Sequence, residues 1–181
     1  MFVPTFTPFN EDLVVAEKEE KIYDVIYWGH VHSQTHINFV DAMKDFKYNF
    51  LSLGTQHWHG EFNRPGLDKY ITGVNVPRSQ MWDLMRKTKI CLITNHAYLK
   101  PHQVANVKSI KNWKNCEAFR DIDNRWVPQY KTRMIESAVN RMLMLVKKNP
   151  WDLDERWFEA GKEFVFFEKD EGDSLKVPQT N

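Results

Sequence analysis

The sequence predicts an α/β fold, a doubly wound parallel sheet built as a single domain. Short apolar runs alternate along the chain with stretches of helical periodicity, which is the pattern of strands joined by crossover helices. The runs lack the regular polar alternation of a half-exposed strand, so we expect a sheet buried on both faces. A length of 181 residues suits one sizeable core.

The chain divides into three parts in this prediction. Residues 1–20 combine prolines and aromatics with a charged run, and we expect a linker or strap there. Residues 21–175 form the domain, and residues 176–181 form a frayed tail.

The apolar runs predict five strands and one shorter one. The five are Tyr23–Gly29, Tyr48–Leu53, Lys89–Thr94, Met142–Val146 and Glu163–Phe167, and the short one lies within Ile71–Val76. The Met142 run is too short for a helix of its own, so we expect a buried strand directly after the preceding helix.

Apolar residues at helical spacing predict three helices. The first includes Ile37, Val40, Ala42, Met43 and Phe46, the second follows Pro77, and the third includes Met134, Ile135, Ala138, Val139 and Met142. Residues 97–127 are long and mixed, and we expect a partly helical insertion because a structureless loop of that length is uncommon.

The predicted topology places candidate ligand contacts at one edge. Ligands of doubly wound sheets bind outside the carboxyl ends of the strands, which here carry Gly29-His30, Gly54-Thr55 and Thr94-Asn95-His96. Arg133 and Glu136 lie one turn apart near the start of the third helix, off its apolar stripe, and are expected to be exposed. An Arg at a helix N-terminus suits phosphate, and a carboxylate suits the two hydroxyls of a ribose.

The stretch from Gln129 to Asp170 resembles the C-terminal, sugar-nucleotide-binding domain of GT-B glycosyltransferases, whose sheet is Rossmann-like. The family pattern joins an R-x-F/I-E-A-like helix, a buried strand and a downstream F-x-x-G-x-E-x-x-x-F/Y motif. The matching residues are Arg133, Ile135, Glu136, Ala138, Phe158, Gly161, Glu163 and Phe167. Pro128 stands where many retaining members carry a Glu, and Asn140-Arg141 replaces the Gly that ends the helix.

The resemblance implies a nucleotide-sugar donor, no obligatory metal or other cofactor, and an acceptor held by another domain or chain. Arg133 would stabilise the leaving diphosphate beside Gly29, and Glu136 would hold the ribose. The base would pack near Thr94, Asn95 and His96. His30 would contact a phosphate or act as an acid–base group, since the ordinary pKa of histidine permits both.

Other interpretations of the same residues remain open. Arg133 and Glu136 at i,i+3 spacing also suit a surface salt bridge. His30-Val31-His32 and His57-Trp58-His59 follow neighbouring strands and would suit the metal of a phosphoesterase. A non-catalytic nucleotide-binding or assembly subunit is the other alternative.

Composition bounds the remaining expectations. The net charge of +1 argues against a nucleic-acid binder that depends on a strong overall field. The basic stretch Lys108, Lys111 and Lys114, with Arg120 and Arg125 beyond, would suit either a solvated face or an acidic acceptor such as DNA. We expect no membrane span, and two cysteines form no disulfide framework, so a cytoplasmic protein is predicted.

Overall fold

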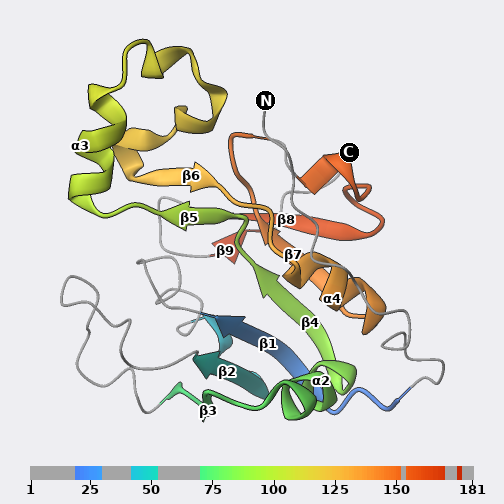
Figure 1. Cartoon of the computed structure of the whole chain (residues 1–181). Coiled ribbons are helices and arrows are strands. Elements are labelled where there is room, and N and C mark those ends of the chain that lie inside the picture. The colour runs from blue at the N-terminus through green and yellow to red at the C-terminus, as the bar shows by residue number, and fades with distance from the viewer. Residues whose placement is uncertain (1–18, 30–41, 53–69, 152–153, 170–174, 177–181) are drawn as a thin grey trace.

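The protein forms an α/β fold around a largely parallel sheet (Figure 1). The computed structural model describes residues 19–29, 42–52, 70–151, 154–169 and 175–176. Six strands pair in parallel, in the order β3-β2-β1-β4-β7-β8, and β9 joins β8 antiparallel. The strands are β1 (Tyr23–Gly29), β2 (Tyr48–Ser52), β3 (Gly73–Val74), β4 (Thr88–Ile93), β7 (Leu143–Lys147), β8 (Phe164–Lys169) and β9 (Leu175–Lys176).

The strand order is that of a Rossmann-like sheet. Counted along the chain without the separate two-stranded ribbon of residues 96–98 and 126–128, the parallel strands run 3-2-1-4-5-6. The order reverses between β1 and β4, and ligands of such folds bind in the crevice at this switch point. The fold alone therefore singles out the carboxyl ends of β1 and β4.

The predicted strands are confirmed, with ends shifted by one or two residues. The Met142 run is a strand and not a continuation of the helix before it. Helix α4 (Arg133–Val139) ends, Arg141 turns the chain with a φ of +53°, and β7 begins at Leu143. The predicted helix after Pro77 is α2 (Arg78–Arg86).

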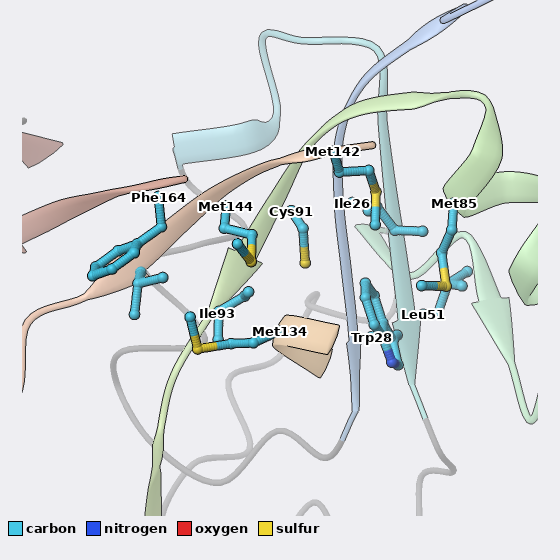
Figure 2. Close-up of a cluster of buried hydrophobic side chains, with 11 residues drawn as sticks. Ile26, Trp28, Leu51, Met85, Cys91, Ile93, Met134, Met142, Met144 and Phe164 are labelled. Atoms are coloured by element: carbon cyan, nitrogen blue, oxygen red, sulfur yellow. The ribbon is translucent and has the colours of Figure 1, made fainter. Parts of the chain in front are cut away.

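Two apolar clusters are built from alternating residues of the strands, which point to opposite faces. One cluster contains Val25, Tyr27, Met43, Phe50, Leu92 and Phe167. The other contains Ile26, Trp28, Leu51, Met85, Cys91, Ile93, Met134, Met142, Met144, Val146 and Phe164, where Met85 and Met134 come from α2 and α4 (Figure 2). Burying one such side chain contributes roughly 1.5–3 kcal/mol to stability. Since both faces of the sheet carry a cluster, apolar packing stabilises the sheet from both sides.

The expected exposure of Arg133 and Glu136 on α4 is wrong, although Met134 of the predicted apolar stripe is buried as expected. The polar side of α4 faces inward as well: Arg133 and Glu136 are 8% and 7% exposed, Ser137 and Asn140 are 0% and 2% exposed, and Ala138 is exposed. Ser137 Oγ donates to the Arg133 carbonyl at 2.7 Å, and Asn140 Nδ2 donates to the Glu136 carbonyl at 2.8 Å. These local bonds satisfy polar groups within the helix and lower the cost of burying them.

The expected insertion is an arm that projects from the end of β4 (Figure 1). Strands β5 (His96–Tyr98) and β6 (Trp126–Pro128) pair antiparallel and carry α3 (Pro101–Ser109) and three short 3₁₀ segments. Ile122 is the only buried residue between positions 99 and 125. The arm is therefore mostly surface, and its side chains face solvent rather than a core of its own.

Candidate functional site

The site begins at Gly29, the last residue of β1. Gly29 has a φ of +138°, which L side chains rarely adopt. The guanidinium of Arg133 occupies the place where a side chain at this position would lie, since a Cβ on Gly29 would be 3.2 Å from Arg133 Cζ and closer still to its Nη2. Glycine is required here because the Arg133 side chain crosses the end of the strand.

Arg133 lies over two aromatic rings of β1. Its Cζ is 5.0 Å from the ring centre of Tyr27 and 5.3 Å from that of Trp28. Burial raises the pKa of Tyr27, and the Arg133 charge opposes that shift. Arg133 is buried, yet its Nη1 has no hydrogen-bond partner among the described residues. A buried donor on a charged group without a partner is costly, so this atom marks a place where an anion would be stabilised.

Glu136 is the nearby carboxylate. Arg78 of α2 reaches it, with Nη2 3.4 Å from Oε1, and the Trp28 side chain hydrogen-bonds it as well. Burial raises the pKa of Glu136, and the neighbouring cations and the Trp28 bond only partly offset that. The surface salt-bridge interpretation of Arg133 and Glu136 is therefore wrong, since both side chains are buried and the ion pair of Glu136 is with Arg78.

Lys131 is a second cation at the site, and the sequence interpretation missed it. Its backbone N–H donates to Asn95 Oδ1 at 3.3 Å, which places it at the end of β4. Burial lowers the pKa of the Lys131 ammonium to about 7, and repulsion from Arg133 acts in the same direction. The available signal was the Lys-x-Arg spacing directly before the helix, which brings two cations to the same turn.

Thr94, Asn95 and His96 follow β4 but do different things. Thr94 is fully buried, and its Oγ1 has no partner among the described residues. His96 begins β5 and stacks on Trp126, with ring centres 4.4 Å apart. Of the three, Thr94 is the residue that offers a hydroxyl beside the switch point.

Asn95 is part of a buried network that shapes the site from behind. Its side-chain amide donates to Asp154 Oδ1, and Asn149 Nδ2 donates to Asp154 Oδ2 at 2.9 Å. Asp154 is completely buried. The network ties the ends of β4 and β7 to the 3₁₀ segment Asp154–Arg156, and it holds the turn that presents Lys131.

The structure does not test the expectations for the loop histidines. His30, His32, His57 and His59, and likewise Gly54 and Thr55, lie outside the described residues. Within the described residues, no group of three or more His, Cys, Asp or Glu side chains is placed to hold a metal ion. Cys91 is buried and Cys116 is exposed, and both are free thiols.

The arm carries basic and aromatic side chains on its surface. Trp113 has the ammonium groups of Lys108 and Lys114 at 5.9 and 5.7 Å from its ring centre. Lys108 also pairs with Asp123 at 2.6 Å. A recess of about 390 Å³ is lined by Trp113, Lys114, Asn115, Cys116, Glu117, Phe119, Arg120, Ile122 and Asp123. The expected basic stretch is thus exposed, and part of its charge is already neutralised.

Comparison with known proteins identifies no relative: no family model, no curated protein and no solved structure matches the chain. The helices in the described part of the chain are too short or too polar to cross a membrane. The structure thus defines a Rossmann-like parallel α/β fold with a cationic cluster at its switch point.

Proposed function

We propose that this chain is the nucleotide-sugar-binding domain of a glycosyltransferase, with the acceptor held by another domain or chain. One observation carries the proposal: Arg133 lies beside Gly29 at the switch point, buried, with Nη1 lacking a partner among the described residues. The crevice at a switch point is where doubly wound folds bind nucleotides. Helix α4 has only seven residues, so the guanidinium rather than the helix N-terminus would hold the anion.

The neighbouring residues suit the other parts of a nucleotide sugar. Glu136 lies one turn along α4 from Arg133 and would accept hydrogen bonds from the ribose hydroxyls. Thr94 brings its buried hydroxyl to the end of β4, where it would bond the base or a phosphate. The base would pack near Thr94, Asn95 and His96, and Arg133 would bind the diphosphate.

The proposed reaction is transfer of a sugar to an acceptor hydroxyl. The bond between the sugar C1 and the diphosphate oxygen breaks, and its electron pair passes to the diphosphate. The acceptor oxygen forms a bond to C1 and loses its proton to a base, for which His30 is the candidate. Arg133 would stabilise the negative charge that develops on the diphosphate.

A ligand panel tests the proposal. Uridine, guanosine, adenosine, cytidine and thymidine diphosphates, and their sugars, are titrated into the protein by calorimetry with and without divalent metal. One series should bind without metal. Because Arg133 is buried against Tyr27 and Trp28, Arg133→Lys is preferable to Arg133→Ala. Lysine keeps the positive charge but lacks the paired N–H donors of the guanidinium, so binding of the diphosphate should weaken about tenfold.

Two further variants refine the test. Arg86→Lys is the matched control. Arg86 lies in the last turn of α2, close to the amino end of β4 and away from the carboxyl ends of the strands, so this change should leave binding unaltered. Glu136→Gln should weaken binding of ribonucleotides more than of 2′-deoxynucleotides. Equal binding by Arg133→Lys and the parent protein, or the absence of any nucleotide binding, would contradict the proposal.

A non-catalytic nucleotide-binding or assembly subunit is the alternative. It shares the binding predictions and differs in turnover. Release of the nucleoside diphosphate from the sugar donor, measured with and without candidate acceptors such as DNA, separates the two functions. Binding of the donor without this release favours the assembly subunit.

A further inference from the structure

Lys131 and Arg133, the two cations at the switch point, have little negative charge beside them in the described part of the chain. Arg78 and Arg133 lie near the carboxylate of Glu136, whose ion pair is with Arg78, and the charge of Arg133 repels the Lys131 ammonium. Neither Lys131 nor Arg133 forms an ion pair with a carboxylate of the described chain. Like charges held close together in a partly dry environment cost free energy unless an anion joins them.

The fold positions the Arg133 side chain and the backbone of Lys131 without any anion. Arg133 is positioned by the rings of Tyr27 and Trp28. The backbone of Lys131 is held at the end of β4 by the bond from its N–H to Asn95, which is itself fixed by Asp154, and the Lys131 side chain is partly buried beside Arg133. The cations are thus brought together by the fold, and their arrangement is one that a polyvalent anion would neutralise.

We propose that Lys131 and Arg133 together form a dianion site that takes the diphosphate of a nucleoside diphosphate, and that Lys131 takes up a proton when the ligand binds. This rests on the proposed function and specifies the ligand class of the same site. Two cations favour a diphosphate over a monophosphate or an uncharged nucleoside, because each phosphate finds its own charged donor.

The free protein has a physical reason to hold Lys131 partly neutral. Burial and Arg133 lower the pKa of Lys131 to about 7, so at pH 8 most of the population lacks the proton. An anion beside the ammonium reverses the sign of the local field and raises that pKa. The other titratable groups on the described elements packed there are Tyr27 on β1, Cys91 on β4, Glu136 on α4, Tyr130 before α4, His96 on β5 and Asp154 behind Asn95.

Calorimetry in two buffers measures the proton. At pH 8 the terminal phosphate of a nucleoside diphosphate is already deprotonated, since its pKa is about 6. The binding enthalpies measured in Tris and in HEPES then differ by the number of protons that the protein takes up, multiplied by the difference between the ionisation enthalpies of the two buffers. We expect close to one proton per bound nucleotide at pH 8, about half a proton at pH 7, and tighter binding at the lower of the two pH values.

Lys131 variants assign the proton to its residue. Lys131→Met should lose the uptake and weaken diphosphate binding about tenfold at pH 7, with much less effect on the monophosphate. Lys131→Arg should keep the affinity, lose the uptake and make binding independent of pH, because guanidinium does not titrate in this range. Lys87→Met, an exposed lysine at the end of α2, is the control and should match the parent protein.

Sulfate separates this inference from the proposed function. It is a dianion without a titratable proton at pH 8, and its general stabilising effect cancels when variants are compared at one concentration. Sulfate should raise the melting temperature of the parent protein more than that of Lys131→Met. If it does so while no nucleotide binds, the anion site stands and the proposed function fails.

The reverse outcome overturns the inference alone. If nucleoside diphosphates bind Lys131→Met as tightly as the parent protein and with the same proton uptake, Lys131 is not part of the site, whereas the nucleotide-binding function stands. Uptake that persists in Lys131→Met and Lys131→Arg would assign the proton to another group and would equally refute the role of Lys131.

Discussion

Replacing Gly29 by alanine tests the geometry at the centre of the site. The new Cβ would lie 3.2 Å from Arg133 Cζ and 3.4 Å from Tyr27 Oη, and closer to Arg133 Nη2 than two atoms pack. The backbone φ of +138° adds strain of roughly 1–3 kcal/mol for a residue other than glycine. Arg133 must then leave its place over the rings of Tyr27 and Trp28.

The expected loss of stability follows from these terms. With a central value of about 2 kcal/mol, the melting temperature of a protein of this size falls by roughly 4–8 °C. Urea denaturation followed by the fluorescence of the tryptophans measures the free energy of unfolding directly. Nucleotide binding should fall along with stability, because the displaced guanidinium no longer lies at the end of β1.

Two companion variants separate strain from collision. Gly161 also has a positive φ, +82°, but lies in an exposed turn, so Gly161→Ala reports backbone strain without a buried partner. In the double variant Gly29→Ala with Arg133→Met, the collision is relieved, and the total loss should be smaller than the sum of the two single losses. Additive losses, or a Gly29→Ala protein as stable as its parent, would refute the proposed contact.

Three further predictions address other parts of the molecule. Ala138→Arg should change the free energy of unfolding by less than about 0.5 kcal/mol, whereas Ser137→Arg should unfold the protein, as measured by circular dichroism, because α4 buries its polar stripe. Lys131→Met should stabilise the protein most below pH 7, and the gain in the free energy of unfolding should shrink as the pH rises from about 7 toward 10. The reason is that the pKa of Lys131 is lowered to about 7 in the folded protein, so burial of its charge destabilises the fold fully only where the lysine is charged in both the folded and the unfolded state. Melting curves across this pH range check the sign. Lys111→Glu combined with Lys114→Glu should weaken binding of a fluorescent DNA oligonucleotide and leave nucleotide binding intact, since both lysines are exposed on the arm and neither pairs with a described carboxylate; equal DNA binding by parent and variant would favour a solvated face.

The alternation of apolar runs and helical stretches was sufficient to predict the sheet. Parallel strands that are buried on both faces are mostly apolar along their length. The runs that begin at Tyr23 and Met142 could therefore be recognised as strands without knowing which strands they pair with. The grouping of Gly29, Thr94 and Arg133 at one edge also follows from connectivity, because parallel strands place all their carboxyl ends together.

The tertiary structure decided which face of α4 is buried. Periodicity selects the apolar stripe, and Met134 of that stripe is buried, but the polar side of the helix is buried too and is stabilised by bonds that Ser137 and Asn140 make to carbonyls of their own helix. Such bonds depend on rotamers and on the shape of the space beside the sheet, which a linear pattern does not contain. The same packing brings Arg133 against Gly29 rather than into solvent.

The electrostatics of the site were likewise a tertiary result. The sequence shows Lys131, Arg133 and Glu136 as charged residues of one short stretch, which an exposed position would leave surrounded by water. Removal from water lowers the pKa of Lys131 and raises that of Glu136, and the partner of Glu136, Arg78, comes from a helix 58 residues earlier in the chain. Desolvation and long-range pairing are properties of the folded packing, so the chemistry of Arg133 and Glu136, which the sequence had indicated, and of Lys131, which it had not, is decided by the tertiary structure.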